Sequence, residues 1–178
     1  MAQSKIPNPH IQLLKSYGKL PFPISKIRPV LNDTVGMDKW ETTYKKHEII
    51  EKFPTENGID KEIQYLYIKM PMFMTDRDLV KENLTWNEYN GNPKTMLIYS
   101  KSTTNAKYPP KEKPIRADMI ISGMYLKEIS DKETLIYMIN NFDLKITTGK
   151  SVVDKAAPEK ATNFFPNLIK YIESKNKK

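Results

Sequence analysis

The chain has 178 residues and a formal net charge of +8. That length is typical of one domain that can bury a core and enclose a ligand. The absence of Cys and the presence of only two His exclude disulfides, thiolate chemistry and a three-histidine metal site, so we expect no cofactor and no metal. No window approaches the ~18 apolar residues of a membrane span, and no signal-peptide pattern follows Met1. We therefore expect a cytoplasmic protein that can associate peripherally with membranes.

The positive charge is concentrated in the C-terminal half. Residues 1–89 hold 13 Lys and Arg against 12 Asp and Glu, whereas residues 90–178 hold 16 against 9. Such a field suits phosphate-bearing partners. Only three of the 29 basic residues are Arg, the residue that reads bases through bidentate contacts, so we expect no nucleic-acid partner. Two alternatives stay open: an anionic membrane surface, or lysines that only solvate the protein.

The N-terminal part is rich in proline. Residues 1–24 contain four prolines and are predicted to be an arm packed on a domain of residues 25–178, with one or two helical turns in residues 10–17. A short helix follows, with Ser25 as its expected N-cap. It ends at Asn32 and Asp33, and a turn leads on to Trp40.

Six strand-like segments come next, each bounded by turn residues. They cover residues 43–53, 63–70, 77–88, 94–101, 115–129 and 133–143. We interpret His47, beside Glu48 in the first segment, as an ordinary surface histidine. In the third segment Val80, Leu84 and Trp86 occupy one side and Lys81, Asn83 and Thr85 the other. Consecutive strands joined mostly by short turns predict an antiparallel meander.

The last element has helical periodicity. From Gly149 to about Ser174, apolar residues that include Phe164, Leu168 and Ile172 recur every three or four positions, and Pro158 and Pro166 are expected to bend or break the helix. Because a meander needs cover on its apolar face, we expect this helix to lie across the sheet. The predicted fold class is α+β, with a curved antiparallel sheet of about six strands around a long C-terminal helix.

Four stretches of the chain resemble the StAR-related lipid-transfer (START) domains. No stretch is specific alone, but their order and spacing extend over about 150 residues. They are residues 30–40, with Asp33 and Trp40; residues 70–80, with Arg77 and Asp78; residues 109–123, with Arg116 and Gly123; and residues 142–172, with Phe142 and Asp143.

The resemblance implies a START-like helix-grip fold and a non-enzymatic protein. Its ligand would be a lipid or another hydrophobic small molecule, bound between the sheet and the C-terminal helix and carried between membranes. Met70, Met72, Phe73 and Met74 form an apolar loop between two of the predicted strands, where polar turn residues are usual, so they either plug the core or form a lid over a cavity. The family's gate lies at this loop, so we expect a lid there. The expected ligand-binding residues are Met70, Met72, Phe73, Met74, Phe164, Leu168 and Ile172, and the expected structural residues are Asp33, Trp40, Arg77 and Asp78, the last two as an ion pair.

The chain departs from the family at its N-terminus. A helix and three strands that usually precede the short helix have no counterpart, which leaves an exposed sheet edge at residues 133–143. We expect the N-terminal arm to run along this edge, or a homodimer to form there. Some sterol-binding members carry a buried acid and base where this chain has Gln64 and Asn83, so a sterol gains no support.

Two further function classes stay open, of which the missing strands support the first. A truncated domain could serve as a protein-interaction or scaffold module. An enzyme of the same superfold is the other alternative, but we find no nucleophile and base constellation in the sequence.

Overall fold

The computed structural model describes residues 11–41, 44–70, 74–146 and 163–175. Its sheet has the strand order β1-β8-β7-β5-β4-β3-β2, with β6 paired to β4. The strands are β1 Ile11–Leu20, β2 Tyr44–Lys52, β3 Ile59–Ile68, β4 Arg77–Trp86, β5 Thr95–Ser102, β6 Ile115–Arg116, β7 Asp118–Ser130 and β8 Glu133–Asp143. The helical elements are α1 Ile24–Asn32, the 3₁₀ turns η1 Val35–Lys39 and η2 Tyr89–Gly91, and residues 163–175.

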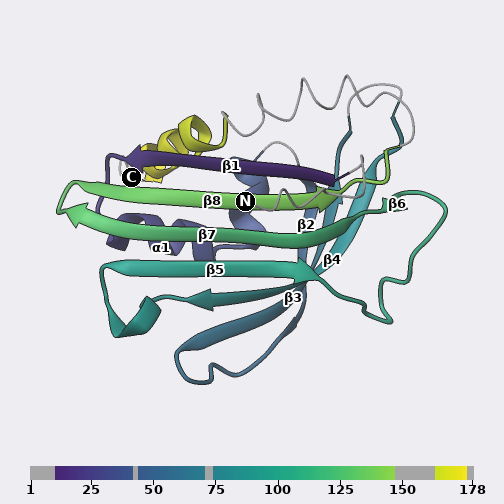
Figure 1. Cartoon of the computed structure of the whole chain (residues 1–178), viewed down its shortest axis with the longest axis horizontal. Coiled ribbons are helices and arrows are strands. Elements are labelled where there is room, and N and C mark those ends of the chain that lie inside the picture. Colours follow the sequence, from purple (N-terminus) through teal and green to yellow (C-terminus); the bar gives the residue numbers. More distant parts are fainter. Residues whose placement is uncertain (1–10, 42–43, 71–73, 147–162, 176–178) are drawn as a thin grey trace, which may run out of the picture.

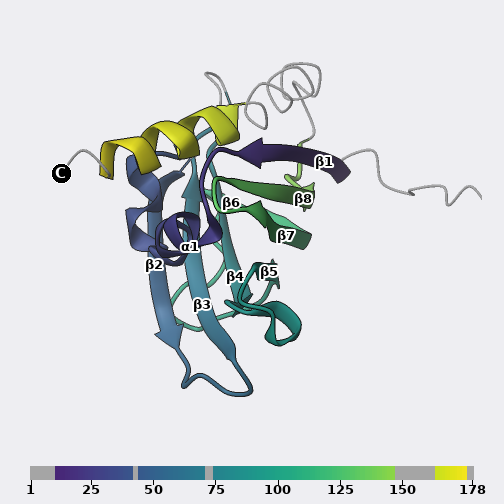
Figure 2. The same cartoon turned by 90° about the vertical axis from the view of Figure 1, so that its left-hand side faces the viewer.

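The sheet curves around helices, as the sequence predicts (Figures 1 and 2). All neighbouring strands are antiparallel except β6, which pairs parallel to β4 over two residues. The sheet has eight strands rather than about six, because β1 and β6 add to the meander. Residues 163–175 are continuously helical, so Pro166 does not break the helix there. Gly149 and Pro158 lie outside the described residues.

Strand β1 covers the edge of β8, as expected of the N-terminal arm. It pairs antiparallel from Ile11 opposite Asp143 to Leu20 opposite Thr134. The helical turns expected in residues 10–17 are therefore wrong from residue 11 onward. The hydrogen-bonding groups of β8 are satisfied by a strand, and Leu20 is fully buried at its end. The division of the chain at residue 24 stays a prediction.

Helix α1 begins at Ile24, two residues earlier than an N-cap at Ser25 predicts, and lies on the concave side of the sheet (Figure 2). Its N-cap is Pro23 rather than Ser25, and no side chain caps it from that position. Instead the Glu128 carboxylate on β7 accepts a hydrogen bond from the Ile24 amide at 2.9 Å. A carboxylate from the sheet thus satisfies an orphan N–H and fixes where the helix begins.

The turn after α1 has the structural role expected of Asp33. Its Oδ1 accepts a hydrogen bond from the Gly36 amide at 3.0 Å. A Cβ on residue 36 would lie 2.0 Å from Asp33 Oδ2, so this close approach requires glycine. Trp40, which is buried, packs edge-on against Phe164 with ring centroids 5.3 Å apart.

The concave side holds two separate apolar clusters. The larger joins α1 and residues 163–175 to the ends of β1, β5, β7 and β8, and it includes Leu20, Ile27, Trp40, Leu126, Ile136, Phe164, Leu168 and Ile172. The smaller lies at the opposite ends of the strands and consists of Leu66, Ile68, Met70, Leu79, Met119 and Ile146. The space between these clusters is the site described below.

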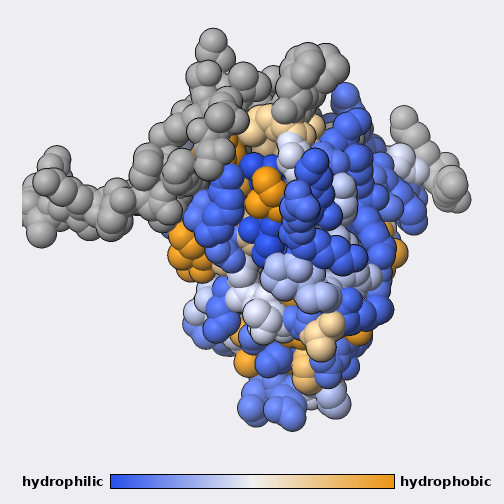
Figure 3. Space-filling view, turned by 90° about the vertical axis from the view of Figure 1, so that its right-hand side faces the viewer, coloured by the Kyte–Doolittle hydropathy of each residue, from blue (hydrophilic) through white to orange (hydrophobic). Residues whose placement is uncertain are grey.

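The outer face of β3 and β4 is also covered. Tyr108, in the loop between β5 and β6, stacks on Tyr65 at a centroid distance of 4.0 Å, next to the buried Val80. Both faces of these strands are therefore buried. The side of the molecule toward this loop is mostly hydrophilic, with small separate apolar spots (Figure 3).

Candidate functional site

A cavity of about 370 Å³ lies between the two apolar clusters. This volume falls within the range of ~300–1,000 Å³ that is usual for small-molecule sites. Its lining comes from the inner faces of seven strands, all but β6, from α1 and η1, and from Phe164 of the C-terminal helix. The cavity thus lies between the sheet and the helices.

A row of polar side chains crosses the cavity wall. Glu62, Asn83, Ser100, Ser122 and Asn140 are successive register partners on β3, β4, β5, β7 and β8, and all five line the cavity. The Ser100 hydroxyl donates to Asn83 Oδ1, and the Ser122 hydroxyl donates to Asn140 Oδ1, each at 2.7 Å. The row separates the two apolar clusters, so the cavity is amphiphilic along its length.

His47 belongs to this site and not to the surface, so its interpretation as an ordinary surface histidine is wrong. It is only 7% exposed, and its Nε2 lies 3.0 Å from Gln64 Oε1. Because the amide oxygen can only accept, Nε2 carries the hydrogen and Nδ1 is the lone-pair nitrogen. This Nδ1 has no hydrogen-bond partner among the described residues. Burial, with help from the nearby charge of Lys81, lowers the pKa of His47 to about 4, so its ring is neutral at pH 7.

Lys81 is a charged, half-buried group that lines the cavity. It follows the fully buried Leu79 on the same face of β4, at the boundary between the smaller apolar cluster and the polar row. Its Nζ donates to Ser100 Oγ over a long 3.4 Å, and among the described residues no carboxylate lies within 4.0 Å of it. Burial lowers the pKa of Lys81 to about 8, and the negative charge of Glu62 opposes that shift only in part.

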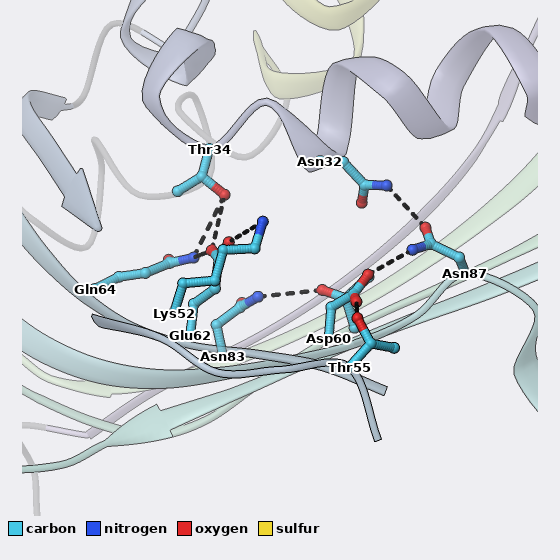
Figure 4. Close-up of polar contacts among 10 residues, drawn as sticks. Asn32, Thr34, Lys52, Thr55, Asp60, Glu62, Gln64, Asn83 and Asn87 are labelled. Carbon is cyan, nitrogen blue, oxygen red and sulfur yellow. Dashed lines mark hydrogen bonds and ion pairs between the residues drawn. The ribbon is translucent and has the colours of Figure 1, made fainter. Parts of the chain in front are cut away.

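The Glu62 carboxylate already has partners within the protein. Its carboxylate accepts hydrogen bonds from Gln64 Nε2 at 2.7 Å and from the Thr34 hydroxyl at 3.4 Å, and Lys52 Nζ lies 3.5 Å away. Figure 4 shows Thr34 reaching from the helical side to these residues on the sheet. Glu62 therefore has partners on three sides, unlike Lys81.

A chain of polar contacts continues at the far end of the cavity. The Asn32 amide at the end of α1 donates to Asn87 Oδ1 at 2.8 Å, and the Asn87 amide donates to Asp60 at 2.9 Å (Figure 4). Thr55 donates to the same carboxylate at 2.5 Å. These contacts tie α1 to the β2–β3 hairpin and to the end of β4, and Asn32 and Asp60 line the cavity at this end.

The residues expected to bind ligand divide into three groups. Met70 and Phe164 line the cavity. Met74 packs against the smaller cluster, whereas Leu168 and Ile172 lie in the larger cluster behind Phe164 rather than in the wall. Met72 and Phe73 lie outside the described residues, so their part in a lid stays a prediction.

Arg77 and Asp78 are both buried, but they do not pair with each other. Neighbouring residues of a strand point to opposite faces. The Arg77 guanidinium donates to the carbonyl oxygens of Leu144 at 2.5 Å and of Thr75, while Asp78 accepts two bonds from Arg116 at 2.8 and 3.0 Å. Both residues thus join β4 to later segments of the chain, as structural residues with other partners than expected.

The cavity contains functional candidates that the sequence did not reveal: His47, Glu62, Lys81, Ser100, Ser122 and Asn140. The one available signal was the polar side of β4, where Lys81, Asn83 and Thr85 alternate with apolar residues. No group of three or more His, Asp and Glu that could hold a metal occurs among the described residues. Within the same residues, no helix is long and apolar enough to cross a membrane.

The sequence and the fold match known proteins of one class. The START domain model matches residues 2–178. Mouse START domain-containing protein 10 is 25% identical over 160 residues, which cover 87% of this chain and 52% of that protein. The chain therefore spans about half the length of the curated relatives it matches.

Solved structures agree with this match in fold. The crystal structure of human STARD10 superposes with a TM-score of 0.76 at 22% identity, covering 93% of this chain and 66% of that one. Human StAR-related lipid transfer protein 5 gives a TM-score of 0.75 at 19% identity, covering 92% and 76%. A curved antiparallel sheet closed on a cavity by a C-terminal helix defines the class of helix-grip proteins. Within that class, the chain belongs to the START domain family.

Proposed function

We propose that this domain binds a lipid or another hydrophobic small molecule in its cavity and carries it between membranes, without catalysing a reaction on it. The observation that carries the proposal is the 370 Å³ cavity, which has apolar walls at the two clusters and a polar row between them. Burial of an acyl chain there would contribute ~0.8 kcal/mol per methylene group. The name of the solved lipid transfer protein 5 and the family membership support the same function.

The test is to identify what the protein holds. Protein purified under native conditions would be extracted with organic solvent and the extract analysed by mass spectrometry, with a surface-matched protein of similar charge as control. We expect a lipid at a substantial molar ratio to protein. Absence of any lipid, together with no uptake from liposomes, would refute the proposal.

We further propose that residues 70–74 form the gate of the cavity. Met70 lines the cavity and Met74 packs beside it, so opening there would connect the smaller cluster to the outside. Replacing Phe73 with Asp should slow lipid exchange between liposomes while leaving the melting temperature nearly unchanged. A large loss of stability would mean that Phe73 is a core plug, because burying an unpaired carboxylate costs several kcal/mol.

Docking on anionic membranes is proposed to be weak and electrostatic. The C-terminal half carries the excess of Lys, and each Lys near an anionic surface contributes ~1 kcal/mol that salt screens within ~8 Å. Cosedimentation with anionic liposomes should fall steeply between low and physiological salt. Binding that does not respond to salt would instead indicate insertion of apolar side chains.

The alternative of an interaction or scaffold module has less support than the sequence suggested. That alternative, and a homodimer at the same place, depended on a bare edge at β8, and β1 occupies this edge. Capture of a partner by a protein that holds no lipid would favour it again.

A further inference from the structure

We propose that Lys81 binds the carboxylate of a single-chain amphiphilic ligand inside the cavity, which makes an acidic lipid of the fatty-acid type the preferred ligand. This inference deepens the proposed function and depends on it. It goes beyond lipid binding in general because it names the headgroup and the residue that recognises it.

The first argument is the pairing of charges around the cavity. A buried charge is costly unless it is paired and hydrogen-bonded. Glu62 meets this requirement through Lys52, Gln64 and Thr34. Lys81, which is half-buried against the cavity, does not, because its one hydrogen bond among the described residues is the 3.4 Å contact to Ser100. An anionic group from a ligand would supply the partner that no described residue of the protein provides for Lys81.

The second argument concerns the neighbours of the ammonium. On β3 the register partner of Lys81 is Gln64, whose amide is engaged by Glu62 and His47. His47 is neutral at pH 7, so it adds no second positive charge. The site therefore has one unpaired ammonium group, and the nearby Glu62 carboxylate already has its own partners. Such a site favours a ligand group with a single negative charge, so a carboxylate fits better than a phosphate dianion.

The third argument is the position of Lys81 at the apolar–polar boundary. Leu79 precedes it on the cavity face, and the apolar residues Met119, Phe142 and Leu144 line the same end of the cavity. A ligand whose carboxylate meets Lys81 can therefore lay its chain against apolar side chains. The 370 Å³ volume lies near the lower end of the usual range of ~300–1,000 Å³, which favours one chain over two.

The experiment compares two probes that differ in charge. Cis-parinaric acid and its methyl ester have the same fluorescent chain, but only the acid is anionic at pH 7. Wild-type protein should bind the acid at least tenfold more tightly than the ester. Lys81→Met, which keeps most of the length of the side chain and removes its charge, should bind both probes equally and retain the ester affinity of the wild type. Lys81→Arg should restore the preference.

The matched control is Lys101→Met. Lys101 is an exposed lysine on the adjacent strand β5, on the opposite face to Ser100, so its replacement should leave the preference unchanged. Wild-type protein that binds acid and ester equally would overturn the inference and leave the proposed function intact, as would a preference that survives in Lys81→Met. Failure of the wild type to bind either probe would overturn the proposed function itself. Ester binding by each variant shows that its cavity is folded.

Discussion

Acid should destabilise this protein through a single buried histidine, His47. Its pKa is about 4 in the folded state against an ordinary value of 6.5, chiefly because the ring is buried. Between these two values the unfolded chain binds a proton that the folded chain does not. Stability therefore falls as the pH drops below 6.5, and the loss is complete below the folded pKa. At ~1.4 kcal/mol per pKa unit, the loss between pH 7 and pH 4 is about 3 kcal/mol.

The variant that isolates this effect is His47→Gln. Its amide can still donate a hydrogen bond toward Gln64 Oε1, but it cannot take up a proton. Other groups that titrate in this range are common to both proteins, so the difference between the two pH dependences reports His47 alone.

The assay is equilibrium unfolding in urea at pH 7 and pH 4, followed by the fluorescence of the buried Trp40 and the partly buried Trp86. The wild type should lose about 3 kcal/mol more than His47→Gln over this interval. Equal losses in the two proteins would refute the reasoning, because they would show that the ring is as easily protonated in the folded state as in the unfolded one.

Three further predictions concern stability. Lys81→Met should stabilise the ligand-free protein by about 1–3 kcal/mol at pH 7 and by little near pH 10.5. The reason is that the pKa of Lys81 is about 8 in the folded state, below its unfolded value, so the free-energy cost of burying its charge is present in full only below pH 8. Urea unfolding at both pH values measures this, and no gain in stability at pH 7 would contradict it. Asp78→Asn should cost about 3 kcal/mol, since Asp78 is 4% exposed and its loss of charge leaves the Arg116 guanidinium unpaired; a cost below ~1 kcal/mol would show that the pair is dispensable. Deleting residues 1–22 should make the protein associate or precipitate, because β8 then has a bare edge and Leu20 is lost from the core; an unchanged, soluble monomer in light scattering would show that the edge needs no cover.

The strands of the meander could be predicted because their signals are local. Alternation of side chains and turn residues determine where a strand begins and ends, and β8 covers the same residues, 133–143, that the sequence indicates. The apolar face of the C-terminal helix was recognisable for the same reason, as Phe164, Leu168 and Ile172 all lie in the core.

Strand β1 could not be predicted from local signals. Leu13 and Tyr17 are exposed, and the segment is held as a strand by pairing with β8, more than 110 residues away in the chain. A segment with such weak local preference adopts the structure that its long-range partner imposes.

The composition of the cavity was also decided by the tertiary structure. Alternation on β4 separates Lys81, Asn83 and Thr85 from Val80 and Leu84, but it does not say which side faces inward. In an ordinary two-layer domain the polar side would face water. Here Tyr108 and its loop cover Val80 on the outside, so the polar side faces the cavity. The prediction that His47 lies on the surface was wrong for the same reason. When both faces of a sheet are covered, the sequence alone cannot show which side of a strand faces solvent.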